Sequence, residues 1–286
     1  MDNFYIIANR QKDEGLKLAS QVAGYLRSKG KNCYIRPASL GTRDNLHHYT
    51  DISQIPKEVE CVLVLGGDGT LLQAARDVVS RQIPLLGINL GTLGYLAEID
   101  RGSIEPALNH LIADEYTVEK RMMLNGKVYH RGKMVAEDVA LNDIVIGRDG
   151  PMGVIRFRNY INKEFLNAYA ADGIIISTAT GSTGYSLSAG GPIVSPETNI
   201  MIMTPISPHT LNTRSIIFPG EDEIGVEIAQ GPHRGNGKAV ASFDGDTNIA
   251  MNVGDRIVIR RSVKDTRIIK ISNISFLEVL RTKMRD

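Results

Sequence analysis

The sequence predicts two domains: an N-terminal α/β domain with a parallel sheet, then a C-terminal all-β, sandwich-like domain. Residues 1–117 alternate short apolar runs with segments whose apolar residues recur at helical spacing, the pattern of a parallel sheet covered by helices. Residues 118–271 instead carry many short β-type runs separated by Gly, Pro and Asn, which is typical of an antiparallel sandwich. A chain of 286 residues is long enough for two domains of ordinary size.

In the first domain, strands and helices are expected in alternation. Residues 4–8 form a short apolar run suited to a buried parallel strand. Apolar residues at positions 16, 19, 23 and 26 then predict a helix, and Gly30 stands where its C-terminal cap belongs. Further strands are expected at 33–35, 61–65 and 83–88, and further helices at 71–79 and 108–112.

In the second domain, the expected strands are short and closely spaced. The clearest candidates lie at 144–146, 154–157, 174–176, 200–203, 215–218, 223–228, 239–243, 256–259 and 267–271. Glycine, proline and asparagine separate them, as in hairpins and meanders.

The composition excludes several classes of function. Lys and Arg total 33 against 32 Asp and Glu, so net charge does not favour binding to nucleic acid or to a membrane surface. The start of the chain does not resemble a signal peptide, and no apolar stretch approaches the roughly 18 residues of a membrane span. Cys33 and Cys61 both lie in strand-like runs. We therefore expect a reduced, cytoplasmic protein.

The most informative segment is Gly66-Gly-Asp-Gly-Thr70, between a predicted strand and a predicted helix. Its glycines allow the backbone to turn sharply and approach a ligand, and N–H groups at a helix N-terminus favour phosphate. A carboxylate at Asp68 would repel phosphate, so it suits a metal ligand or a proton acceptor for an attacking hydroxyl. An ordinary N-cap at Asp68 explains the segment equally well.

Two further segments offer polar groups. Residues 171–192 lead from a strand into a loop rich in Gly, Ser and Thr that contains Asp172 and one aromatic residue, Tyr185. This loop suits a hydroxyl-rich ligand, although a Gly/Ser-rich turn is an alternative. Asn142 and Asp143 directly precede a strand, where an Asx-turn is equally plausible. Phosphate-binding P-loop, dinucleotide G-x-G-x-x-G, zinc-peptidase and Ser-hydrolase motifs are absent from the sequence.

Taken together, the order and spacing of these segments resemble the NAD kinase family. The resemblance rests on Gly66-Gly-Asp-Gly-Thr70, Asn142-Asp143, Asp172-Gly173 and Thr180-Gly-Ser-Thr-Gly-Tyr185, and it extends through residues 91–95, 187–192 and 205–211. It implies phosphoryl transfer from ATP, or a similar donor such as polyphosphate, to the 2′-hydroxyl of the adenosine ribose of NAD. It also implies a divalent metal such as Mg²⁺, a homo-oligomer (dimer or tetramer), an active site between the two domains, and a C-terminal segment, 272–286, that packs back on the first domain.

The resemblance assigns roles to individual residues. Asp68 would be the catalytic proton acceptor, and the phosphate loop would comprise Gly66, Gly67, Gly69 and Thr70. Asn142 and Asp143 would hold the adenosine part of NAD, and Asp172 the nicotinamide side. The full set implied to bind NAD is Asp68, Gly69, Tyr95, Asn142, Asp143, Asp172, Thr183, Gly184, Tyr185, Ser186, Leu187, Ser188 and Asp246. The resemblance identifies no dedicated cluster of metal ligands in the chain.

The chain departs from the family pattern at four positions. Asp143 replaces the usual Glu, and Gly184 replaces a common Ala. Ala179 stands where Pro is common, and Ala170 stands where many relatives have Arg or Lys. These changes bear on the surroundings of the adenine and the diphosphate and leave the carboxylate at position 68 in place.

Two other functions share some of these features. Lipid kinases of the diacylglycerol or sphingosine type also have a Gly-Gly-Asp-Gly loop, but they would require an apolar acceptor groove, whereas residues 180–188 are small and polar. A non-catalytic dinucleotide-binding regulator would be favoured by loss of the acid at position 68, and Asp68 is present.

Overall fold

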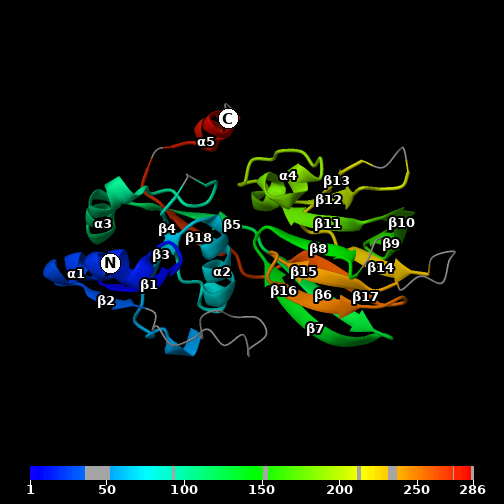
Figure 1. Cartoon of the computed structure of the whole chain (residues 1–286), viewed down its shortest axis with the longest axis horizontal. Coiled ribbons are helices and arrows are strands. Elements are labelled where there is room, and N and C mark those ends of the chain that lie inside the picture. The colour runs from blue at the N-terminus through cyan, green and yellow to red at the C-terminus, as the bar shows by residue number, and fades with distance from the viewer. Residues whose placement is uncertain are drawn as a thin grey trace. The chain divides into compact units, whose positions relative to one another are not determined.

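The chain divides into two compact units, each with its own sheets (Figure 1). The structure, a computed structural model, describes residues 1–35, 52–91, 94–150, 154–210, 214–230, 237–272 and 274–284. Unit 1 comprises Met1–Arg121 and Lys264–Asp286, and unit 2 comprises Met122–Val263. Residues 92–93 and 211, which belong to segments that carry the family resemblance, lie outside the described residues.

Unit 1 contains a sheet whose first four strands are parallel, as the sequence predicts. The strand order is β2-β1-β3-β4-β18-β5, and β18 runs parallel to β4 and antiparallel to β5. The bounds are β1 Asn3–Ala8, β2 Asn32–Ile35, β3 Cys61–Gly66, β4 Leu85–Asn89, β5 Thr117–Arg121 and β18 Thr266–Lys270.

Helices cover both faces of this sheet. These helices are α1 Lys17–Ser28, α2 Asp68–Val78 and α3 Ile104–Ile112, whereas α5 Phe276–Lys283 has no buried residue. Buried residues of α1 and α3 join one face of the sheet in a single core cluster that includes Leu26, Leu63 and Leu108. Leu71 of α2 packs closely on Gly87 of β4, where a Cβ would lie 2.6 Å from Leu71 Cδ1. None of the described helices combines the length and apolar character needed to cross a membrane.

Unit 2 consists of two antiparallel sheets that share one core. Their strand orders are β10-β9-β14-β17-β6-β7 and β13-β12-β11-β8-β15-β16. The bounds are β6 Leu124–His130, β7 Lys133–Ala140, β8 Asp143–Arg148, β9 Ile155–Ile161, β10 Glu164–Ala171, β11 Gly173–Thr178, β12 Ile200–Ile206, β13 Ile216–Pro219, β14 Ile224–Ala229, β15 Ala239–Phe243, β16 Thr247–Met251 and β17 Arg256–Arg261.

Alternation along the strands places the core between the sheets of unit 2. In β9, Ile155 and Phe157 are buried while Arg156 and Arg158 are exposed, as expected of a strand with one solvated face. Phe157 packs near Tyr169 of β10, with ring centroids 6.1 Å apart. Apolar residues from both sheets meet in one cluster, which is the sandwich that the sequence predicts.

The division of the chain differs from the predicted boundaries at both ends of unit 2. Of the run 267–271, expected in the second domain, residues 267–270 belong to β18, which pairs with β4 and β5 of unit 1. Strand β5, Thr117–Arg121, belongs to unit 1, so the division falls after residue 121 rather than after the predicted residue 117. Both strands pair with residues distant in sequence, and periodicity within a short run carries no information about its partner.

The shared core of unit 2 gives a stability prediction. Phe157 is fully buried, so Phe157→Ala should lower the free energy of unfolding by about 3–5 kcal/mol, measured by urea denaturation. Phe165, on the adjacent strand, is 56% exposed and meets Tyr160 edge-on. Phe165→Ala should cost about 1 kcal/mol or less. Equal losses in the two variants would contradict this placement of the core.

Candidate active site

The turn from β3 to α2 depends on glycine at position 66. A Cβ on Gly66 would lie 2.4 Å from Thr70 Oγ1, so no larger residue fits without displacing the first helical turn. Asn9 Nδ2 donates to the same hydroxyl at 3.2 Å and ties the turn to the end of β1. The helix begins at Asp68, three residues before the expected start at residue 71, and Gly67 occupies the N-cap position. Asp68 is therefore not the N-cap residue of this helix.

The carboxylate of Asp68 is held by three consecutive backbone N–H groups. Tyr95 N–H donates to Oδ2 at 2.8 Å, and the N–H groups of Leu96 and Ala97 donate to Oδ1 at 3.2 Å. A Cβ on Gly94 would lie 2.0 Å from Oδ1, so this approach requires glycine. An ionised carboxylate has about four acceptor sites. The three bonds leave one site on Oδ2, which could accept a hydrogen bond from a hydroxyl group.

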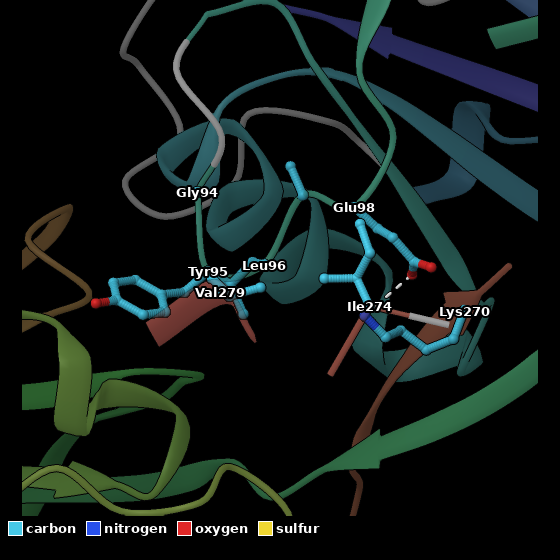
Figure 2. A pocket seen from close by; sticks show the side chains of 8 residues that line it. Gly94, Tyr95, Leu96, Glu98, Lys270, Ile274 and Val279 are labelled. Carbon is cyan, nitrogen blue, oxygen red and sulfur yellow. Dashed lines mark ion pairs between the residues drawn. The ribbon is translucent and has the colours of Figure 1, made fainter. Parts of the chain in front are cut away.

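The remaining predicted residues of unit 1 flank this carboxylate. Gly69 is exposed in the first turn of α2, and Thr70 is partly buried beside Gly66. Tyr95 is partly buried, and Figure 2 shows its ring pointing away from Glu98 and Lys270. Unit 1 thus brings together the phosphate-loop residues, Asp68 and Tyr95.

In unit 2, a second carboxylate holds the turn that contains Asn142 and Asp143. Asp244 accepts from Leu141 N–H at 2.8 Å, from Asn142 N–H at 2.8 Å and from Asp143 N–H at 3.1 Å. Sequence reasoning missed Asp244. The Asp-Gly pair 244–245 joins β15 to β16 with positive φ at both residues, which is the signature of a tight hairpin turn. That signal marks the turn but not the contact with residues 141–143.

The opposite side of the same turn is held by the segment after β11. Thr178 Oγ1 donates to Leu141 O at 2.7 Å, and Thr178 N–H donates to Asn142 O at 2.8 Å. A Cβ on Gly181 would lie 2.1 Å from Asn142 O, so glycine is required there. The side-chain Oδ1 of Asn142 is buried and has no hydrogen-bond partner among the described residues. A buried amide oxygen without a partner is suited to accept a ligand hydrogen bond.

The environment of Asp143 disfavours its charged form. Its side chain is almost fully buried. Burial, and then the negative charge of Asp244, raise the pKa of Asp143 to about 7. A ligand hydroxyl that donates a hydrogen bond to this carboxylate would offset part of the free-energy cost of ionising Asp143.

The loop 180–188 folds back along β11. It contains η5 (Thr180–Thr183) and α4 (Tyr185–Ser188). Ser186 Oγ lies 3.1 Å from Thr204 Oγ1, and Thr204 pairs with Ile175 in the middle of β11. Ser186 is therefore a buried structural contact. The other predicted residues of the loop are at least partly accessible: Thr183, Gly184, Tyr185, Leu187 and Ser188.

Asp172 lies at the other end of β11 from Asn142 and Asp143. It precedes Gly173, which pairs with Gly147, whereas Asp143 pairs with Ser177. Five residues of extended strand separate the two acids by about 17 Å. Asp172 is partly exposed, and its Oδ1 lies 3.9 Å from Arg148 Nε. Arg148 therefore places a positive charge beside Asp172. Ala170, which stands where many relatives have Arg or Lys, cannot supply one.

Unit 2 therefore arranges its predicted residues along one strand rather than around one point. Asn142 and Asp143 stand at one end, the loop 180–188 returns along the middle, and Asp172 stands at the other end. Asp246 is partly buried in the hairpin turn after β15, where its N–H donates to Phe243 O at 3.0 Å. An extended ligand with polar groups at both ends suits this arrangement.

Two family models match most of the chain. The ATP-NAD kinase N-terminal domain matches residues 4–116, and the ATP-NAD kinase C-terminal domain matches residues 141–271. The chain is similar to the NAD kinase of Lachnospira eligens, with 45% identity over 293 residues, 99% of this chain and 100% of that protein. It is 44% identical to the NAD kinase of Agathobacter rectalis over 288 residues, 99% of each protein.

Two solved structures resemble the whole chain. The yeast NADH kinase complexed with NADH matches with a TM-score of 0.89 and 23% identity, covering 100% of this chain and 88% of that one. The NAD kinase of Archaeoglobus fulgidus in complex with ATP matches with a TM-score of 0.75 and 21% identity, covering 99% and 98%. At these identities the likeness shows a shared fold.

The raised pKa of Asp143 predicts how stability depends on pH. In the unfolded chain an Asp titrates near pH 4, so between about pH 4 and 7 the folded state keeps a proton that the unfolded state loses. Raising the pH through this range should lower the contribution of Asp143 to the free energy of unfolding. The free energy of unfolding of Asp143→Asn, measured by urea denaturation, should thus rise relative to that of wild type as the pH is raised from 5 to 8. Asp149→Asn, at an exposed carboxylate, is the control. A wild-type pH profile in the Asp143 variant would contradict the prediction.

Proposed function

The chain belongs to the NAD kinase family, and we propose that it transfers a phosphoryl group from ATP to the 2′-hydroxyl of the adenosine ribose of NAD. The observation that carries this proposal is the Asp68 carboxylate, fixed by three N–H groups with one acceptor site left on Oδ2. A ribose hydroxyl is a poor nucleophile, and a positioned acceptor for its proton assists its attack on phosphorus.

The residues of unit 1 would orient the reacting groups. Asp68 would accept a hydrogen bond from the 2′-hydroxyl through Oδ2 and take its proton as the oxygen attacks the γ-phosphorus and ADP departs. The turn 66–70 would leave room for phosphate at the N-terminus of α2, where unpaired N–H groups favour anions. Tyr95 would lie beside the adenine.

The residues of unit 2 would hold NAD along β11. Asn142, with its unpartnered buried oxygen, and Asp143 would bind the adenosine part. Asp172 would bind the nicotinamide side at the far end of the strand, and accessible groups of the loop 183–188 and Asp246 would line the path between them. The length of β11 supports an extended dinucleotide in preference to a compact ligand.

A divalent metal is also part of the proposal. Within the described parts of the chain, no three His, Cys, Asp or Glu residues gather into a possible metal site. Asp68 keeps one acceptor site, so the chain offers at most one carboxylate contact there. Mg²⁺ usually binds through one or two carboxylates together with substrate phosphates, so the ion would arrive on ATP and neutralise phosphate charge. We further propose a cytoplasmic homo-oligomer that uses ATP rather than polyphosphate as the donor.

The central test is Asp68→Asn. Asparagine keeps the size of the side chain and an oxygen for two of the three N–H donors, but it cannot take a proton from the ribose. We expect kcat to fall by about 10²–10⁴ while NAD affinity stays within a few-fold of wild type. Formation of NADP from NAD, ATP and Mg²⁺ is followed with a coupled dehydrogenase.

The matched control for Asp68 is Asp114→Asn in the same unit. Asp114 is an exposed carboxylate that pairs with the N-terminal amine at 2.8 Å, so its loss should leave kcat unchanged. Near-normal turnover in Asp68→Asn would refute the proposed role. Simultaneous loss of turnover and NAD binding, with an unchanged melting temperature, would make Asp68 a binding residue instead.

The placement of NAD along β11 predicts an asymmetric effect of Asp172→Ala. Loss of a charged hydrogen bond costs about 1.5–3 kcal/mol, so NAD affinity should fall about 10- to 100-fold while ATP affinity changes little. Isothermal titration calorimetry measures both constants. Asp149→Ala, which removes an exposed carboxylate of unit 2, serves as control. Unchanged NAD affinity in Asp172→Ala would count against this placement.

A further inference from the structure

The segment 94–98, which holds Asp68 at one end, is tied to the C-terminal part of the chain at the other. The side chain of Glu98 is 3% exposed. Its Oε1 accepts from Ile271 N–H at 3.0 Å and from Ser272 N–H. Its Oε2 lies 3.1 Å from Lys270 Nζ. Figure 2 shows this ion pair on the side of the segment opposite to the Tyr95 ring.

These contacts compensate a buried charge. An ionised carboxylate out of water requires both a counter-charge and hydrogen bonds, and here Lys270 supplies the first and two backbone N–H groups supply the second. The residues concerned are the last residue of β18 and the two that follow it. A cavity of about 20 Å³, room for about one water, is lined by residues 94–98, Lys270 and two residues of the C-terminal segment, Ile274 and Val279.

The backbone of the segment leaves little freedom between its two attachments. Glu98 N–H and Ile99 N–H both donate to Gly87 O at 3.2 Å, and a Cβ on Gly87 would lie 2.8 Å from Ala97 Cα. The N–H donors to Asp68 are on residues 95–97, directly before Glu98. A shift of the chain at Glu98 would therefore move those donors.

We propose that Glu98 is a positioning residue for phosphoryl transfer: by binding residues 270–272, it sets the place of the N–H groups of residues 95–97 and hence of the Asp68 carboxylate. The inference rests on the proposed function of Asp68. It assigns no contact with substrate to Glu98 itself. Misplacement of a reacting group by about 1 Å can reduce a rate about 100-fold, so a buried anchor one residue away from the donors can matter for turnover.

The test compares Glu98→Ala with Glu98→Gln. Alanine removes the acceptor for both N–H groups, and kcat for NADP formation should fall about 10- to 100-fold. NAD affinity by calorimetry should fall by no more than a few-fold, because only the proposed contacts of Asp68 and Tyr95 would shift, while those at residues 142, 143 and 172 are untouched. Glutamine keeps an acceptor oxygen and should restore most of kcat. If Glu98→Ala does not accumulate as folded protein, Glu98→Asp replaces it in the test. Its carboxylate is one methylene closer to the backbone, and it should show the same loss of kcat.

Glu60→Ala is the matched control for a purely structural effect. Glu60 also accepts two backbone N–H groups, from Asp2 at 2.6 Å and Asn3 at 2.9 Å. It lies before the first residue of β3, at the end of that strand remote from Asp68. Glu60→Ala should lower the melting temperature without lowering kcat. An equal loss of kcat in the two alanine variants would overturn the inference.

A double-mutant cycle tests whether Glu98 acts through Asp68. In an Asp68→Asn background, Glu98→Ala should reduce the rate by no more than about 2-fold, because the group that it positions is gone. The same 10- to 100-fold loss in both backgrounds would overturn the inference, as would wild-type kcat in Glu98→Ala. Wild-type protein that makes no NADP would overturn the proposed function and this inference with it.

Discussion

In each unit, the candidate functional residues depend on a carboxylate that accepts three consecutive backbone N–H groups. Asp68 receives those of residues 95–97, and Asp244 receives those of residues 141–143. Residues 95–97 and 141–142 lie outside helices and strands, so their N–H groups need another acceptor, because an unsatisfied buried donor costs about 1–3 kcal/mol. One short acid therefore fixes the course of several residues, and the side chains on those residues take their positions from it.

Close approach between segments then determines where glycine is required. Gly94 admits the Asp68 carboxylate, and Gly181 admits the carbonyl of Asn142, with 2.0 Å and 2.1 Å to the position that a Cβ would occupy. Neither contact could survive an alanine without movement of the backbone. By contrast, Gly69, in the turn 66–70, has no atom within 4 Å of the position that its Cβ would occupy. Gly69 is thus free of this internal constraint, and space beside it is open to a ligand.

The sequence predicted those parts of the molecule that follow from local pattern. Periodicity located strands such as 61–65 and helices such as 71–79, and the Gly-Gly-Asp-Gly turn marked a strand-to-helix junction. What it could not predict depends on long-range pairing: that 267–271 joins the first sheet, that Asp244 holds residues 141–143, and that Glu98 binds residues 271–272. Each of these contacts joins residues about 100 or more positions apart, and nothing in the local pattern indicates such a partner. At Asp68 the sequence left two uses open, an N-cap and a proton acceptor or metal ligand, and only the helix start at Asp68 and the partners of its carboxylate decide against the N-cap.

The arrangement of acids in unit 2 has an energetic consequence for the site. Burial, and then the charge of Asp244, raise the pKa of Asp143, and Asp244 also holds the backbone that carries Asp143. The same contact therefore costs stability through like-charge repulsion and gains order in the turn through its hydrogen bonds. A ligand hydroxyl that donates a hydrogen bond to Asp143 would reduce the free-energy cost of this repulsion and leave the hydrogen bonds of the turn in place. Binding would then relieve electrostatic repulsion already present between the two acids, so a locally unfavourable carboxylate contributes to affinity.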